Sequence, residues 1–200
     1  MNKKFLLATK NKNKIIEFKN ILNQYNIDTI DLNNVDIEEP VETGETFKEN
    51  SNLKAKYYGD KISCCAIADD SGLCITALNN FPSIYASRYA KQCGGYLEAF
   101  NDLKEKLKDK QDNSAFFICH LSFYDYDKQK MYDFEGRVDG KIIFDEESMK
   151  SQDFFGYDPI FFPDGYHKSF TQIGSEIKNK ISHRARAIEQ FKDFLKDFNR

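Results

Sequence analysis

Residues 64–77 read CCAIADDSGLCITA, two apolar runs that enclose four polar residues. The runs Cys64–Ala68 and Leu73–Ala77 are typical of short buried strands, and Asp69-Asp70-Ser71-Gly72 separates them. Two adjacent carboxylates repel each other, and burying either costs free energy unless a cation or a donor compensates it. A hard divalent ion such as Mg²⁺, which binds carboxylates together with phosphate oxygens, would compensate both. The stretch predicts two strands around a metal or catalytic site, with a tight turn capped by Asp69 as the structural alternative.

The sequence on both sides of this stretch alternates between strand and helix patterns. Before it we expect a strand at 4–8, a helix over 15–25, a strand at 27–32 and a helix over 46–58 that carries Phe47, Leu53 and Tyr57 on one face. After it we expect a helix over 94–108, strands at 116–126, 131–138 and 141–144, and a final helix from about Ser182. This order predicts a mixed α/β fold, and since no segment marks a boundary, residues 1–200 are expected to form one domain.

The bulk composition excludes several classes of protein. The formal net charge of the 200 residues is −3, whereas a general nucleic-acid binder normally has a basic domain. No run approaches the roughly 20 apolar residues of a membrane helix, so no membrane partner is expected. The five cysteines are odd in number and form no C-x-x-C pair, which favours free thiols in a reducing compartment. We therefore expect a cytoplasmic protein.

A polar segment between the first strand and the first helix has the composition of a phosphate-binding loop. It reads Thr9-Lys10-Asn11-Lys12-Asn13-Lys14. The backbone N–H groups of a helix N-terminus attract anions, and a hydroxyl, an amide and an ammonium on the same turn add donors. The structural alternative is ordinary capping of the helix by Thr9 or Asn11, with solvated lysines beside it.

A second polar group lies in the last third of the chain. Phe155-Gly156-Tyr157-Asp158 combines aromatic rings with a carboxylate, which suits a flat base that stacks and is hydrogen-bonded along one edge. Lys178, His183 and Arg184 add donors near the start of the last helix, for which Ser182 is the expected N-cap.

Five segments together resemble a known family. They are Thr9-x-Asn11-x-x-Lys14, Glu42-Thr43-Gly44-x-Thr46-Phe47-x-Glu49-Asn50, Ala68-Asp69-Asp70-Ser71-Gly72-Leu73, Phe155-Gly156-Tyr157-Asp158-Pro159-Ile160-Phe161 and Lys178-x-x-Ile181-Ser182-His183-Arg184. In this order they resemble the HAM1-like, inosine triphosphate pyrophosphatase family of non-canonical purine NTP pyrophosphatases, over essentially the whole chain.

The resemblance implies a two-lobed α/β fold with a long central mixed sheet flanked by helices, an active site in the cleft between the lobes, and a homodimer. It implies that Asp70 is the general base and a Mg²⁺ ligand. Many members have two acidic residues before the Thr-Gly pair, whereas this chain has Val41 and Glu42, so Glu42 is the second ligand expected. The implied substrate contacts are Thr9, Lys10, Asn11, Lys12, Asn13, Lys14, Ser71, Phe155, Gly156, Tyr157, Asp158, Lys178, His183 and Arg184.

The implied activity is the Mg²⁺-dependent hydrolysis of the purine nucleoside triphosphates ITP, dITP and XTP to the monophosphate and pyrophosphate, which cleans the nucleotide pool. One alternative is a Maf-like pyrophosphatase for modified pyrimidine or methylated nucleotides. Another is a nucleotide-binding regulatory module without hydrolysis, although a mere binder has little need of the paired carboxylates Asp69 and Asp70.

Overall fold

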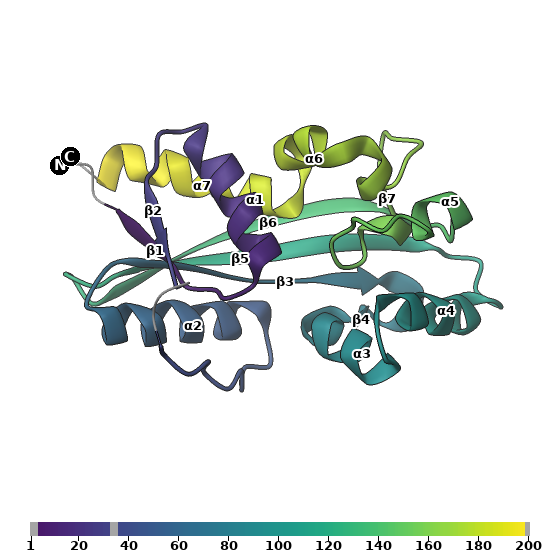
Figure 1. The fold of residues 1–200 in the computed structure, drawn as a ribbon, viewed down its shortest axis with the longest axis horizontal. Coiled ribbons are helices and arrows are strands. Elements are labelled where there is room, and N and C mark those ends of the chain that lie inside the picture. The colour runs from purple at the N-terminus through teal and green to yellow at the C-terminus, as the bar shows by residue number, and fades with distance from the viewer. Residues whose placement is uncertain (1–3, 33–35, 199–200) are drawn as a thin grey trace. The chain divides into compact units, whose positions relative to one another are not determined.

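The computed structural model describes residues 4–32 and 36–198, in which strands and helices alternate as expected (Figure 1). In chain order the elements are β1 (Phe5–Leu7), α1 (Lys12–Asn23), β2 (Thr29–Asp31), α2 (Phe47–Ile62), β3 (Ala66–Ile75), β4 (Phe81–Pro82), α3 (Ala86–Cys93), α4 (Tyr96–Leu107), β5 (Ser114–Asp125), β6 (Lys130–Ile142), α5 (Glu146–Met149), β7 (Phe161–Pro163), α6 (Phe170–Ile181) and α7 (His183–Phe198). None of the helices in the described ranges is long and apolar enough to cross a membrane.

The described strands form one seven-stranded sheet. The order is β2-β1-β3-β5-β6-β7, and β4 pairs with β3 outside this path. Strand β1 is parallel to both of its neighbours, whereas β4 is antiparallel to β3 and β7 is antiparallel to β6. The prediction of a mixed α/β fold with a mixed sheet is confirmed.

The chain folds into two compact units, each made of separate segments. Unit 1 comprises the described residues of Met1–Asp70, Cys119–Gly136 and His183–Arg200, and unit 2 comprises Ser71–Ile118 and Arg137–Ser182. Strands β3, β5 and β6 each contribute residues to both units. The predictions of one domain and of a site in a cleft between two lobes stay predictions.

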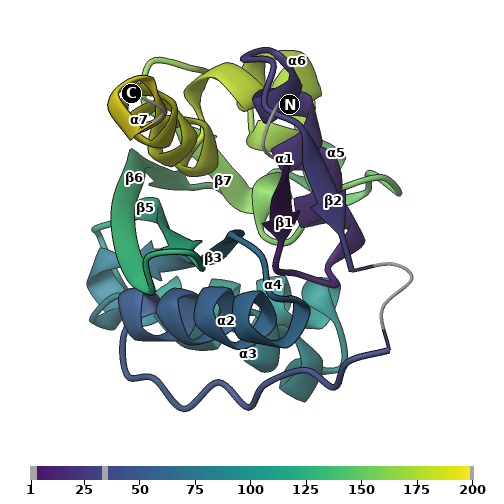
Figure 2. The same cartoon turned by 90° about the vertical axis from the view of Figure 1, so that its left-hand side faces the viewer.

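Unit 1 has helices on both faces of its strands (Figure 2). Because side chains alternate along a strand, successive residues of β1 enter different cores. Phe5 and Leu7 pack with α1 and α7, while Leu6 packs with α2 on the opposite face. Residue 67 of β3 lies in the first core, and residues 66 and 68 lie in the second. This alternation fixes the directions in which the next residues of β3 point.

Unit 2 has one apolar core. It joins the second half of β3 to helices α3, α4 and α6 and to strand β7. Rings dominate this core, and Phe100, Phe161 and Phe170 are each at most 1% exposed. Large buried aromatic side chains of this kind supply much of the apolar area that a domain buries.

The structure corrects two of the predicted strand boundaries. Residues 66–75 form a single strand rather than two strands around a turn, because the carboxylates of Asp69 and Asp70 find partners on opposite faces. Strand β6 continues to Ile142, so the separate strand predicted at 141–144 is wrong. Helices α3 and α6 were not predicted at all.

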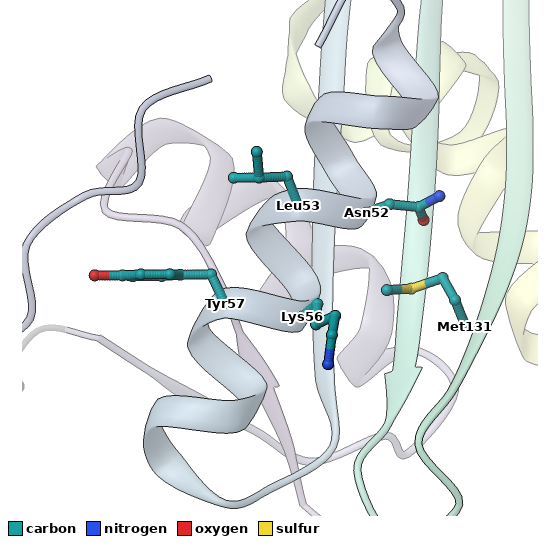
Figure 3. A pocket seen from close by; sticks show the side chains of 5 residues that line it. All are labelled: Asn52, Leu53, Lys56, Tyr57 and Met131. Carbon is teal, nitrogen blue, oxygen red and sulfur yellow. The ribbon is translucent and has the colours of Figure 1, made fainter. Parts of the chain in front are cut away.

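The predicted apolar face of α2 is also wrong. The buried residues of the helix are Asn50, Ser51, Ala55, Tyr58 and Gly59. Leu53 and Tyr57 of the predicted face are only half-buried, and with Met131 and two polar residues of α2 they line a hollow of about 400 Å³ (Figure 3). The face of α2 that packs on the sheet combines polar Asn50 and Ser51 with apolar residues such as Ala55 and Tyr58, and its polar part belongs to the candidate site.

Candidate active site

Strand β3 directs its two adjacent aspartates to opposite faces of unit 1. Asp70 follows Ala66 and Ala68 in the alternation and faces α2, whereas Asp69 follows Ile67 and faces α1 and α7. Both side chains are nearly inaccessible, with exposures of 2% for Asp69 and 7% for Asp70. The two carboxylates therefore belong to two different groups of side chains.

The group around Asp70 contains a second carboxylate and a shared cation. The Lys54 ammonium lies 2.7 Å from Glu42 Oε1 and 3.2 Å from Asp70 Oδ1. The side-chain amide of Asn50 donates to the other oxygen, Asp70 Oδ2, at 3.3 Å. Helix α2 thus supplies two donors to Asp70, four residues apart on one helical face. The predicted pair Asp70 and Glu42 is brought together on either side of one ammonium.

Burial and neighbouring charges act in opposite directions on the pKa values of Asp70 and Lys54. Burial is the largest cause of a raised pKa for Asp70, which the nearby Lys54 and Lys14 only partly offset. For Lys54, burial acts to lower the pKa, but the carboxylates of Asp70 and Glu42 outweigh it and raise the pKa. A carboxyl group with a raised pKa beside a permanent cation is a suitable general base near neutral pH.

The segment before α2 is fixed to this group through its backbone. Thr46 is the N-cap of α2 and forms a capping box with Glu49. The N–H of Gly44 donates to Asn50 Oδ1 at 2.9 Å. A Cβ at position 44 would lie 2.7 Å from that same oxygen, so only glycine allows the approach. The amide of Asn50 therefore joins the loop that carries Glu42 to the carboxylate of Asp70.

The group around Asp69 is fully compensated. Its oxygens lie 3.1 Å from Lys14 Nζ and 2.9 Å from Arg184 Nη2. Arg184 also donates to Glu17, so two cations face two carboxylates. The charges of Lys14 and Arg184 outweigh the effect of burial and hold the pKa of Asp69 well below its usual range. Asp69 is therefore a buried structural anion, and its compensation needs no metal ion.

Two side chains predicted to contact substrate lie in this ion cluster. Arg184 is 1% exposed, and its guanidinium contacts the carboxylates of Asp69 and Glu17 and lies over the ring of Phe18. Lys14 is partly accessible, with 14% of its side chain exposed. Contact of either residue with substrate stays a prediction, and the ion pairs add a structural role for both.

The loop of residues 9–14 is exposed over most of its length. Asn11 is the N-cap of α1, and its side-chain oxygen accepts from the backbone N–H groups of Asn13 and Lys14. The capping alternative is therefore confirmed for Asn11. The hydroxyl of Thr9 accepts from the N–H of Asn11, and Lys10 Nζ donates to the carbonyl oxygen of Ile37. Lys12 and Asn13 are exposed, so solvent and ligands can reach this end of α1.

Unit 2 brings together three of the side chains predicted to bind a base. Lys178 Nζ lies 2.5 Å from Asp158 Oδ2 and 5.0 Å from the centre of the Phe155 ring. The ion pair is buried, and Phe155 is half-buried. Tyr157 has a different place, since its ring is 3% exposed and its hydroxyl donates to the carbonyl oxygen of Ala86. A half-buried ring beside a donor and an acceptor is the arrangement expected of a base-binding pocket.

The start of α7 is held against β6 in unit 1 by a glycine. A Cβ on Gly136 would lie 2.0 Å from the carbonyl oxygen of His183 and 2.5 Å from the backbone nitrogen of Ala187. The absence of a side chain lets the strand and the helix meet backbone to backbone, which buries His183 to 4% exposure. Ser182, the expected N-cap of this helix, lies in extended conformation between α6 and α7.

Sequence reasoning missed Lys54 and gave Asn50 no role. Both lie on α2 at a spacing of four residues, the interval that places two side chains on one helical face. A lysine one turn after the Glu49-Asn50 pair was the signal that could have identified Lys54. It was overlooked because lysines on helices are mostly solvated.

Two groups of side chains in the described residues offer carboxylate oxygens to a metal ion. Asp70 and Glu42 already hold a cation, the Lys54 ammonium, and so present hard oxygen donors of the kind that Mg²⁺ binds. In the second group, atoms of Cys65, Asp125 and Asp127 lie within 4.8 Å of one another. One of its three donors is the soft sulfur of Cys65, whereas Mg²⁺ prefers hard oxygen ligands. The first group fits the predicted ion.

Comparisons with known proteins find relatives over nearly the whole chain. A model of the Ham1 family matches residues 5–194. A dITP/XTP pyrophosphatase of Clostridium perfringens is 41% identical, over 97% of this chain and 98% of its own length. A dITP/XTP pyrophosphatase of Zymomonas mobilis is 35% identical, over 94% of this chain and 89% of its own. The structure of the Staphylococcus aureus Ham1 protein superposes with a TM-score of 0.83 at 34% identity, covering 98% of this chain and 99% of that one.

Proposed function

The chain belongs to the Ham1 family, and from this premise we propose that it hydrolyses the purine nucleoside triphosphates dITP, XTP and ITP to the monophosphate and pyrophosphate. The observation that carries the proposal is the Asp70–Lys54–Glu42 group, in which the buried carboxylate of Asp70 and the half-buried carboxylate of Glu42 share one ammonium. Removal of such compounds cleans the nucleotide pool.

Asp70 acts as the general base. Its carboxylate orients a water molecule and removes a proton from it as the oxygen attacks the α-phosphorus. The raised pKa of Asp70 brings its proton affinity closer to that of the water it must activate, which improves general-base catalysis. Lys54 and Asn50 hold the two oxygens of the carboxylate in place.

Asp70 and Glu42 are the residues that would hold Mg²⁺. When bound, the ion would neutralise charge on the phosphate oxygens and on the pyrophosphate leaving group. Lys54, whose ammonium lies between the same carboxylates, then contributes its charge beside them. The loop of residues 9–14 contacts the triphosphate through its exposed amides and lysines.

The base is recognised by its edge. Hypoxanthine and xanthine present a 6-oxo acceptor next to an N1–H donor, and the Lys178–Asp158 pair offers the matching donor and acceptor. Adenine presents the reverse order and would set donor against donor and acceptor against acceptor, at a cost of roughly 1–3 kcal/mol for each mismatch. Phe155 stacks on the base, His183 supplies a further donor, and Ser71, Gly156 and Tyr157 complete the predicted contacts.

Pyrophosphate release from a panel of nucleotides tests the proposal. The panel contains dITP, XTP and ITP, the four standard deoxynucleoside triphosphates, and methylated and modified pyrimidine nucleotides, each with Mg²⁺ and with EDTA. We expect turnover of the first three in Mg²⁺ and its loss in EDTA. A chain that leaves all three intact is not such an enzyme, and preferred turnover of the modified pyrimidines would support the Maf-like alternative.

We also propose that the protein is cytoplasmic and acts as a homodimer. The homodimer is the arrangement implied by the family resemblance, and light scattering after gel filtration tests it directly. A mass near that of one 23.3 kDa chain would contradict it.

A further inference from the structure

A connected set of polar side chains joins α2 to strands β5 and β6. Ser51 Oγ lies 3.0 Å from His120 Nδ1 and 2.7 Å from Ser122 Oγ. Ser122 in turn donates to Asp133 Oδ1 at 3.2 Å, and the Lys48 ammonium lies 3.0 Å from Asp133 Oδ2. All five residues belong to unit 1, and Ser51 and Ser122 are 0% exposed.

Hydrogen bonds join these side chains into one connected set. A carboxylate only accepts, so the hydroxyl of Ser122 donates to Asp133. The hydroxyl of Ser51 donates to the carbonyl oxygen of residue 48 and lies within hydrogen-bond distance of both Ser122 Oγ and His120 Nδ1. Ser51 is therefore the junction between α2 and the side chains of Ser122 and His120.

Three elements meet in this chain of hydroxyl groups. Ser51 lies on α2, Ser122 and His120 lie on β5, and Asp133 lies on β6. A buried hydroxyl that loses its partner costs free energy, so a rotation or shift of α2 is opposed by the bonds at Ser51. Ser51 directly follows Asn50 and lies three residues before Lys54, the two donors to Asp70.

We propose that Ser51, Ser122 and His120 are positioning residues, which fix the rotation of α2 so that Asn50 and Lys54 meet the Asp70 carboxylate. The proposal rests on the function proposed above. Ser51 bonds to His120 and Ser122, whereas its α2 neighbours Asn50 and Lys54 bond to Asp70, so the three residues act on Asp70 through α2. A shift of about 1 Å in a reacting group can cost 10²-fold in rate, so a small change at Ser51 is enough to be measured.

The test compares Ser122→Val with Ser122→Thr, because valine and threonine have the same shape and differ only in the hydroxyl group. We expect kcat for dITP to be about 10-fold lower in the valine variant than in the threonine variant, with KM equal within about twofold. Amide hydrogen exchange over residues 47–55 should be faster in the valine variant. Ser51→Ala removes the junction itself and should act in the same direction.

Thr29→Val makes the same change on β2, outside the chain of hydroxyl groups, and should alter neither kcat nor the exchange in α2. Equal kcat and equal exchange in Ser122→Val and Ser122→Thr would overturn the proposal while the proposed function stood. If the natural sequence released no pyrophosphate, the proposed function would fail. The exchange in α2 would then still decide whether these hydroxyl groups hold the helix.

Discussion

Asp69 and Asp70 are neighbours in the chain, yet the two faces of β3 give them different chemistry. Asp69 meets two cations, Lys14 and Arg184, and a second carboxylate, Glu17, balances the charge. Asp70 shares the Lys54 ammonium with Glu42, and burial outweighs the nearby cations and raises the pKa of Asp70. The first face is complete without a ligand, and the second can accept a further cation.

The difference shows how a fold can hold a reactive carboxylate in a buried strand. Breaking a buried ion pair by removing one partner is costly, so the compensated Asp69 ties α1 and α7 to β3. The opposite face is then free to keep an under-compensated carboxylate, which is unfavourable for folding and useful for catalysis. Replacing each aspartate separately by asparagine should therefore affect catalysis at one position and stability at the other.

Asp70→Asn should have the largest effect, and it should act chiefly on catalysis. The change removes the proposed base, and general-base catalysis is worth roughly 10²–10⁴-fold, so we expect kcat for dITP to fall by about 10³-fold. The folded state should persist, because the amide oxygen of asparagine still accepts from one of the two donors, Lys54 or Asn50. Pyrophosphate release and thermal unfolding measure the two quantities. Asp193→Asn, which removes an exposed carboxylate of α7, is the control and should retain full turnover.

Asp69→Asn should act mainly on stability, in contrast to Asp70→Asn. Lys14 and Arg184 would face only Glu17, and uncompensated buried charge of this kind costs about 3–5 kcal/mol of unfolding free energy. Urea unfolding measures the change, and Asp193→Asn again serves as the control. An Asp69→Asn protein with an unchanged urea midpoint would show that the ion cluster does not stabilise the fold.

The sequence points to Asp69 and Asp70 but not to the side chains that contact them. Asp70 is identified from the paired carboxylates between two apolar runs, whereas Glu42 is expected as its partner only from the family resemblance. The continuity of β3 was missed because polar residues within an apolar run indicate a break, and nothing local shows that Arg184, 115 positions away, would compensate Asp69. Helix α6 was missed because Gly174 interrupts it with a φ of 79°.

A change of pH should alter the contributions of the two carboxylates to the unfolding free energy in opposite directions. The pKa of Asp69 is lowered by Lys14 and Arg184, so its contribution to stability is complete above the unfolded value of about 3.9 and is lost as the pH falls below it. The pKa of Asp70 is raised by burial, so its ionisation lowers the unfolding free energy as the pH rises above about 3.9.

Urea unfolding of the natural sequence and of both asparagine variants, in EDTA between pH 3.5 and pH 7, measures these contributions. The stability advantage of the natural sequence over Asp69→Asn should grow with pH. The stability advantage of the natural sequence over Asp70→Asn should shrink as the pH rises and can change sign. Two differences that change in the same direction would contradict the assignment of opposite environments.

Val41→Glu should have the smallest effect and sharpens the charge argument on the Asp70 face. Val41 is 78% exposed and directly precedes Glu42. The family resemblance leads us to expect an acidic residue at this position. An added exposed charge is worth about 0.2–1 kcal/mol, so the Mg²⁺ concentration for half-maximal turnover should fall about two- to threefold. Val41→Gln adds a side chain of the same size without the charge and should leave this concentration unchanged. Because position 41 is exposed, neither variant should shift the urea midpoint, and equal Mg²⁺ dependence in the two would mean that the Asp70 face does not bind the ion through its charge.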